Sequence, residues 1–235
     1  MKATVKRASF CAAAVMCLAV FATQTFAQKA RTGDATRHAS DAADVFTKVM
    51  GVRDKAIPKE LLDKAEAIAV FPGVLKVAFG LGGKGGQGVV SRRIKGGWSQ
   101  PVFFNIGGGS IGAQIGASKT DYVLLIMNDD GLNSLLKDKF EVGGEVGVAA
   151  GPVGREAAAS TDARLTAGIL SYSRSKGAFI GAAIKGAVIS PDNDLNEAFY
   201  GSKAKELLTG KPATLAEMPS AVKIFPRTLA RYSAK

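Results

Sequence analysis

The chain has few side chains from which a reactive or metal-binding site is usually built. It has two cysteines, Cys11 and Cys17, both near the N-terminus, and one histidine, His38. Zinc and other soft metals are bound by clustered Cys and His side chains, and serine–histidine catalysis needs an imidazole beside its nucleophile. We therefore expect no enzyme activity, no metal and no other cofactor.

The first 27 residues predict a secretory signal peptide. A basic start is followed by an apolar stretch at residues 8–22 and by small side chains up to Ala27, after which we expect cleavage. As a helix the apolar stretch would be about 22 Å long, short of the ~30 Å that a transmembrane anchor needs. Both cysteines lie in this segment, so the exported chain would have no disulfide.

Acidic residues are absent from a long central part of the chain. Between Glu66 and Asp121 there is no Asp or Glu. The basic residues of this acid-free window are Lys76, Lys84, Arg92, Arg93, Lys95 and Lys119. The formal net charge is +11 for the whole chain, and about +8 without the signal peptide. This charge favours anionic partners such as phospholipid headgroups, acidic polymers or nucleic acid, and a solvated basic surface without a partner is the alternative.

A glycine run within this window, VAFGLGGKGGQGVV at residues 77–90, contains the spacing Gly80-x-Gly82-x-x-Gly85 of dinucleotide-binding loops. Such a loop must open a helix whose N-terminus faces the pyrophosphate. The residues that follow are rich in glycine and valine and favour a strand instead. We therefore expect no nucleotide, and we interpret the run as a turned link between two antiparallel strands, with Lys84 at its tip.

Apolar residues at helical spacing predict two helices before the first strand, within residues 41–55 and 58–68, and one inserted later, within 129–140. The preceding residues 28–40 are polar and lack periodicity, which predicts a flexible leader. Pairs of carboxylates near the expected helix starts, such as Asp192 and Asp194, are interpreted as caps and not as acid–base catalysts.

From Ala67 onward, short β-rich runs are separated by glycine-rich breaks. The breaks are too short for crossover helices, so the strands are expected to pair antiparallel as a meander. Residues 194–208 predict helical turns, and the basic, proline-broken residues 209–235 predict a C-terminal appendage. The sequence thus predicts an α+β domain at residues 41–208: a large antiparallel, strongly curved or barrel-like β-sheet with N-terminal helices and one inserted helix.

Three motifs carry a resemblance to a known family: Trp98-Ser-x-Pro101, Gly151-Pro152-Val-Gly154-Arg155 and Ser171-Tyr172-Ser173-Arg174-Ser-Lys176-Gly177. Together with the surrounding strand sequences, over about residues 40–202, they resemble the SYLF domain family, also called lipid-binding or actin-binding. The resemblance implies binding to anionic membranes, with phosphoinositides as the ligands of eukaryotic members and actin as a partner of some, and no catalysis. Because the signal peptide predicts export, actin binding is not expected here.

Six residues of the acid-free window are the predicted lipid-binding residues: Lys76, Lys84, Arg92, Arg93, Lys95 and Trp98. Each Lys or Arg close to an anionic bilayer contributes roughly 1 kcal/mol, and an indole ring suits the membrane interface. Core packing is the alternative role for Trp98. Strand alternation places Arg92 and Arg93 on opposite faces of a sheet, so at least one of them must have another role.

The resulting expectation is a periplasmic or secreted, non-enzymatic protein that associates peripherally with anionic phospholipid. Nucleic acid is not an expected partner, since the chain has no recognised nucleic-acid motif and is expected to be exported. Two alternatives are a structural or interaction protein of the cell envelope, which holds an acidic polymer or a protein, and a carrier of an apolar ligand inside the curved sheet.

Overall fold

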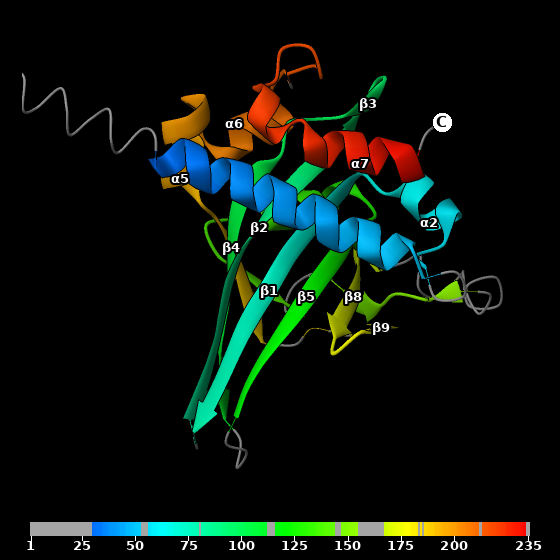
Figure 1. Ribbon diagram of the computed structural model, residues 1–235, viewed down its shortest axis with the longest axis vertical. Helices are drawn as coiled ribbons and strands as arrows, with labels where there is room; N and C mark the ends of the chain where they lie inside the picture. The colour runs from blue at the N-terminus through cyan, green and yellow to red at the C-terminus, as the bar shows by residue number, and fades with distance from the viewer. Residues whose placement is uncertain are drawn as a thin grey trace, which may run out of the picture.

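The structure, a computed structural model, describes residues 30–52, 56–79, 81–111, 116–143, 147–154, 167–182, 184, 186–211 and 213–233. The predicted signal peptide at residues 1–27 lies outside these residues, as does Gly80 of the glycine run. The described chain is an α+β fold in which helices pack on both faces of one large curved sheet (Figure 1), as the sequence predicts.

In the described residues the sheet has ten strands in the order β6-β10-β4-β2-β1-β5-β8-β7, with β3 paired to β2 and β9 paired to β8. The strands are β1 (Ala67–Phe79), β2 (Leu81–Ile94), β3 (Gly97–Trp98), β4 (Val102–Ile111), β5 (Gly116–Ile126), β6 (Phe140–Val142), β7 (Val148–Ala150), β8 (Ile169–Ser175), β9 (Ala178–Gly181) and β10 (Ala187–Pro191). A helix at residues 30–50 precedes them. The further helices are α2 (Lys59–Lys64), α3 (Asp129–Leu135), α5 (Asn193–Tyr200), α6 (Ala204–Thr209), the 3-10 turn η2 (Ser220–Val222) and α7 (Ile224–Tyr232).

The strand order differs from the predicted meander. β1 lies between β2 and β5, and β4 pairs with the other edge of β2. Although β4 and β5 follow one another in the chain, they therefore lie on opposite sides of the β1–β2 hairpin, which is a Greek-key arrangement. Among the described pairs, β7 and β8 are parallel and the others are antiparallel.

The first half of β1 is buried on both faces of the sheet. All residues of the segment 67–71 are buried, and alternate side chains enter two different cores. Ile68 and Val70 belong to the first core, under the helix at 30–50, α2 and α7. Ala69 and Phe71 belong to the second core, with apolar side chains of α3, α6 and β10. A continuous apolar run is typical of a strand that is covered on both faces.

The helix at residues 30–50 corrects the predicted flexible leader at 28–40, of which residues 30–40 are described. Its fully buried positions recur at helical spacing: Ala35, Ala39, Ala42, Phe46 and Val49. Alanine adds little to a hydrophobic pattern but is the best helix former, so this stripe is easily overlooked in the sequence. His38, assigned to the leader, is also buried on this helix.

The other predicted helices are present, but α2 and α3 are shorter than expected. Ile68, expected in the first of these two helices, belongs to β1. The side chain that caps α3 is Asn128, which accepts a hydrogen bond from the Gly131 backbone N–H at 2.9 Å. Asp192 caps α5 by accepting from the Leu195 N–H at 3.1 Å, which confirms its interpretation as a cap.

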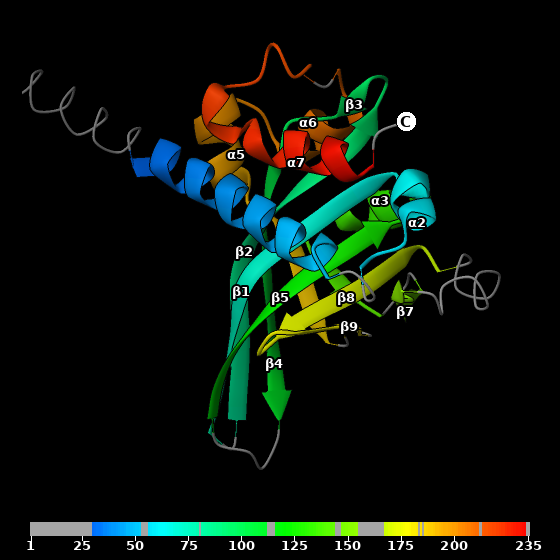
Figure 2. The ribbon, with the colours of Figure 1, turned by 45° about the vertical axis from the view of Figure 1, so that its right-hand side comes forward.

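The C-terminal segment packs into the domain, so its interpretation as an appendage is wrong. Val222, Phe225 and Leu229 are fully buried in the first core. α7 lies beside the helix at 30–50, across the same end of the sheet (Figures 1 and 2), and the rings of Phe46 and Tyr232 join the two helices with centroids 5.9 Å apart.

The described residues of the glycine run lie in strands: residues 77–79 end β1 and residues 81–90 belong to β2. β1 and β2 pair without interruption from Leu75 opposite Gly85 to Phe79 opposite Leu81, so Lys84 lies within a strand and not at a loop tip. The outer parts of β1, β2, β4 and β5 extend well beyond the helices (Figures 1 and 2). We call this projection the arm; it comprises residues 73–79, 81–87, 107–111 and 116–120.

Candidate functional site

The six predicted lipid-binding residues lie toward opposite ends of the β1–β2 hairpin. Lys76 and Lys84 lie on the arm. Arg92, Arg93, Lys95 and Trp98 lie at or beyond the other end of β2. At about 3.3 Å per strand residue, Lys84 and Arg93 are roughly 30 Å apart. The five basic residues therefore do not form one surface.

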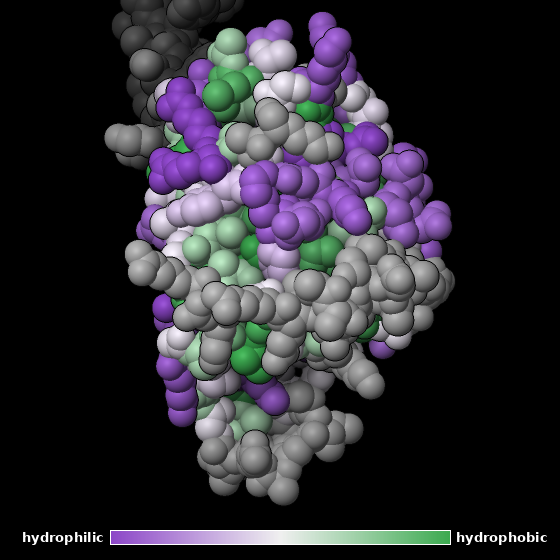
Figure 3. Space-filling view, turned by 90° about the vertical axis from the view of Figure 1, so that its right-hand side faces the viewer, coloured by the Kyte–Doolittle hydropathy of each residue, from purple (hydrophilic) through white to green (hydrophobic). Residues whose placement is uncertain are grey.

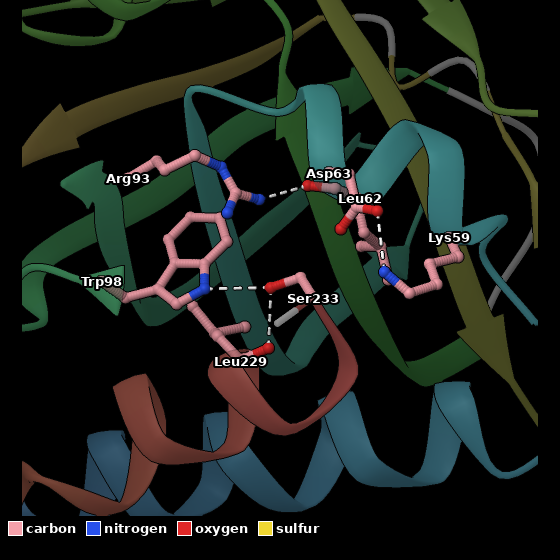
Figure 4. A network of polar contacts seen from close by, with 7 residues as sticks. All are labelled: Lys59, Leu62, Asp63, Arg93, Trp98, Leu229 and Ser233. Carbon is pink, nitrogen blue, oxygen red and sulfur yellow. Dashed lines mark hydrogen bonds and ion pairs between the residues drawn. The ribbon is translucent and has the colours of Figure 1, made fainter. Parts of the chain in front are cut away.

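Arg93 stabilises the end of a helix. Its Nε donates to the carbonyl of Ala65 at 3.0 Å, and its Nη2 donates to the carbonyl of Leu62 (Figure 4). These carbonyls lie at the C-terminal end of α2, where backbone acceptors are incompletely satisfied; the Leu62 carbonyl also accepts from the Ala65 N–H, at 3.3 Å. Burial lowers the pKa of Arg93, while the carboxylates of Asp63 and Glu66 oppose this shift. The guanidinium group of Arg93 therefore has its hydrogen-bond partners within the protein.

Trp98 is a core residue. Its side chain is buried, its indole N–H donates to Ser233 Oγ at 3.0 Å, and Ser233 Oγ donates to the Leu229 carbonyl at 2.8 Å (Figure 4). The Arg93 guanidinium lies 4.3 Å from the centroid of the indole ring. The predicted role of Trp98 in membrane insertion does not fit this position, because the ring already packs between β2 and α7.

Arg92 has the equivalent role on the other face of the sheet. Its Nη1 donates to the carbonyl of Leu208, near the C-terminal end of α6, at 3.2 Å. Its Nη2 lies 3.8 Å from a carboxylate oxygen of Asp129. Leu208 belongs to the second core and Leu62 to the first, which confirms that Arg92 and Arg93 point to opposite faces.

Lys95 is exposed in the turn between β2 and β3. This turn borders an open pocket of about 500 Å³ beside α7. The pocket is lined by Arg93, Ile94, Lys95, Gly96, Gly97, Trp98, Ala230 and Ser233. Because Trp98 and Ser233 bond to each other and Arg93 binds α2, Lys95 is the member of this lining best placed to meet an anion from solvent.

Lys76 and Lys84 are cross-strand neighbours on one face of the arm. Lys84 is partly buried and its side chain extends over Gly108 of β4, where an added Cβ would lie 2.9 Å from Lys84 Cε. Burial and, second, the positive charge of Lys76 lower the pKa of Lys84 below its usual value. The arm thus holds two like charges together, an arrangement that an anionic ligand would stabilise.

The arm carries positive charge without negative charge. Its charged residues are Lys76, Lys84 and Lys119, and its sequence contains no Asp or Glu. Lys119 lies opposite Leu75 in the β1–β5 register, on the other face of the arm from Lys76. Lys119 was in the acid-free window but was not predicted as a site residue, since the strand order that brings β5 beside β1 could not be deduced from the sequence.

Two apolar side chains of the arm were also missed by the sequence analysis. Leu75 is 43% exposed and Val77 is 48% exposed. Across the β1–β2 register they face Gly85 and Gly83, which have no side chains to cover them. These two half-exposed side chains give the arm an apolar component next to its lysines, which is the combination that a membrane interface accepts.

The side of the molecule shown in Figure 3 is most hydrophilic in its upper half, at the end opposite the arm. Among the described residues, no group of His, Cys, Asp and Glu side chains is arranged to hold a metal ion. No helix in the described part of the chain is long and apolar enough to cross a bilayer.

The described chain is an α+β fold with one large curved sheet, and comparison with known proteins identifies its family. A family model described as Ysc84, Las17-binding protein actin regulator, matches residues 107–232, more than half of the chain. The chain belongs to this family, which is the SYLF domain family.

Individual relatives support this assignment. LAS seventeen-binding protein 3 of Saccharomyces cerevisiae is 37% identical over 164 residues, which are 67% of this chain and 36% of that protein. Human SH3 domain-containing YSC84-like protein 1 is 29% identical over 183 residues, which are 76% of this chain and 53% of that protein. The chain thus spans about a third to a half of the length of these relatives. The name of the yeast relative describes a binding protein, and the description of the family model also refers to actin regulation.

The motifs that carry the family resemblance have structural roles where they are described. Trp98 joins β3 to α7, and the carbonyl of Pro101 accepts from the Tyr200 hydroxyl at 2.7 Å. An added Cβ at Gly151 would lie 2.0 Å from the ring of Tyr172, so only glycine fits beside that ring. The motifs therefore identify the fold more directly than they identify a ligand.

Proposed function

We propose that this protein binds reversibly to anionic phospholipid at a membrane surface. The main support for the proposal is the composition of the arm, which contains Lys76, Lys84 and Lys119 but no Asp or Glu. Three lysines close to an anionic bilayer contribute about 3 kcal/mol, which strengthens binding by roughly 100-fold over a neutral surface. Charge of this size supports weak, salt-sensitive binding unless apolar groups also enter the bilayer.

If the predicted signal peptide directs export, the membrane would be one facing the periplasm or the outside of the cell. Phosphatidylglycerol or cardiolipin would then supply the negative charge, in the role that the family resemblance implies for phosphoinositides in eukaryotic members. Nothing in the proposal requires catalysis or a cofactor.

Sedimentation with lipid vesicles tests the proposal. The chain without residues 1–27, which retains every described residue, is mixed with vesicles of phosphatidylglycerol, cardiolipin, phosphatidylinositol phosphate or phosphatidylcholine over a series of salt concentrations. We expect binding to the anionic vesicles that weakens as salt rises, because exposed charges are screened over about 8 Å at physiological ionic strength. Equal binding to phosphatidylcholine, or no binding to any vesicle, would contradict the proposal.

Binding of a protein partner is a second candidate, favoured by the description of the family model, which refers to Las17 binding and actin regulation, and by the name of the yeast relative. Cosedimentation with actin filaments at the same salt concentrations tests it. Pelleting with filaments but not with anionic vesicles would favour this candidate over the first.

A further inference from the structure

The arm projects from the domain beyond both cores. β1 is fully buried as far as Phe71, and Val74 is the last core residue along it. The segment 75–77 that follows is exposed, as are residues 116–119 on β5. Figures 1 and 2 show the same four strands continuing past the helices at the opposite end of the molecule from α7. Among the residues of the arm whose side chains are described, those of β1 beyond Val74 belong to neither core. Their composition is therefore not set by core packing.

The end of the arm is uncharged, and the lysines lie a short distance behind it. Its described residues 77–79, 81–83, 109–111 and 116–118 contain no Asp, Glu, Lys or Arg. Lys76 lies three residues from Phe79, which pairs with Leu81 at the end of the hairpin. Three strand residues span about 10 Å.

The three lysines lie at nearly the same level of the arm. Lys76 pairs with Lys84 on one side and with Ser118 on the other, so Lys119 is displaced from it by a single residue. Lys76 and Lys84 point to one face and Lys119 points to the opposite face. The arm thus carries lysines on both faces at one level. The exposed Leu75 and Val77 lie next to this level, and the uncharged end of the arm lies beyond it.

We propose that the end of this arm inserts into the interface of an anionic membrane, with Lys76, Lys84 and Lys119 at the level of the lipid phosphates. This inference rests on the proposed function and names the element that performs it. Peripheral elements enter the boundary between headgroups and acyl chains by about 5–10 Å, which matches the distance from the lysines to the end of the arm. An acidic polymer would be held by the lysines alone, and an uncharged end would add nothing to its binding.

The depth of insertion is measurable with a tryptophan placed on the arm. Val77→Trp replaces a side chain that is 48% exposed, and the native Trp98 is buried at 3% exposure and serves as an internal reference. With phosphatidylglycerol vesicles we expect a blue shift of the added emission and quenching by brominated acyl chains. Ile224→Trp is the matched control, because Ile224 is 44% exposed on α7, away from the arm. We expect neither effect for that variant.

A charge variant tests the same contact without a fluorophore. Val77→Asp should lower binding to phosphatidylglycerol vesicles at least tenfold, whereas Ile224→Asp should leave it unchanged. If Val77→Trp binds vesicles with no blue shift and no quenching, insertion is wrong although the proposed function stands. Such a result would indicate that the lysines hold the protein at the vesicle surface by charge alone, which is also how they would hold an acidic polymer. If the unmodified chain binds no anionic vesicle, the proposed function itself fails.

Discussion

The Arg93 guanidinium lies 4.3 Å from the centre of the Trp98 indole ring and donates at the same time to two carbonyls at the end of α2. Trp98 in turn donates to Ser233, just beyond α7. This pair connects an N-terminal helix, the β2–β3 hairpin and the C-terminal helix. Arg93 and Trp98, two residues of the acid-free window, therefore stabilise the packing of these elements.

Replacement of Arg93 should destabilise the protein without affecting vesicle binding. Arg93→Ala removes two charge-assisted hydrogen bonds and the contact with Trp98, so we expect the free energy of unfolding to fall by about 2–4 kcal/mol. Urea unfolding monitored by Trp98 fluorescence measures this. Lys95→Ala, at the exposed turn nearby, is the control and should change stability by less than about 0.5 kcal/mol. Equal stability of the two variants would show that the Arg93 contacts are not formed.

Deletion of residues 209–235 should unfold the domain. It removes Val222, Phe225 and Leu229, all fully buried, and exposes the apolar side of the helix at 30–50. Burial of such side chains contributes about 1.5–3 kcal/mol each, comparable in sum with the whole stability of a domain. Circular dichroism and gel filtration should show loss of cooperative unfolding and aggregation. A monomeric, cooperatively folded product would contradict the packing of α7.

Two glycines of the same run should respond differently to substitution. A Cβ at Gly88 would lie 2.3 Å from the Val70 carbonyl oxygen and 2.5 Å from the ring of Phe71, whereas a Cβ at Gly85 meets nothing within 4 Å. We expect Gly88→Ala to lower the free energy of unfolding by about 1–3 kcal/mol, the usual cost of overpacking. Gly85→Ala should be nearly neutral. Thermal unfolding of both variants provides the comparison, and similar melting temperatures would refute it.

Lys84→Glu should weaken binding to anionic vesicles while leaving the fold intact. Reversing one charge changes the interaction with the bilayer by about 2 kcal/mol, or roughly 30-fold in affinity. The new carboxylate would face Lys76 across the strands, so the melting temperature should stay level or rise. Lys95→Glu is the control at the other end of β2. Stronger loss of binding for Lys95→Glu would place the membrane contact at the pocket beside α7.

His38 should contribute to acid sensitivity. It is 8% exposed, its Nε2 has no hydrogen-bond partner within the described residues, and burial together with Arg37 lowers its pKa below 6.5, against the opposing carboxylates of Asp34, Asp41 and Asp192. A depressed pKa in the folded state means that the stability is present above pH 6.5 and is lost as the pH falls below that value. The stability of the unmodified chain should therefore decline more steeply from pH 7 to pH 5 than that of His38→Leu. The free energy of unfolding is measured by urea unfolding at each pH. If it falls equally with pH for the unmodified chain and for His38→Leu, this prediction is wrong.

Much of the fold could be predicted from local pattern. β1 begins at Ala67, where the β-rich runs were predicted to begin, because an apolar run after a helix is typical of a covered strand. The order of the strands could not be predicted, since the pairing of β5 with β1 depends on contacts across the sheet. The helix at 30–40 was missed because its buried stripe there consists of alanines, whose contribution depends on close packing and not on their hydrophobicity.

The sequence predicted the charge of the candidate site but not how its basic residues are distributed in space. The sequence alone determined that the window from Glu66 to Asp121 is basic, that Arg92 and Arg93 point to opposite faces, and that the chain resembles the SYLF family. The tertiary structure decided which charges are available to a partner. Arg92 and Arg93 bind the carbonyls of helix ends, whereas Lys76, Lys84 and Lys119 are brought together only by the pairing of β1 with β2 and β5. Charge is a property of each residue, but its exposure depends on what the rest of the chain packs against it.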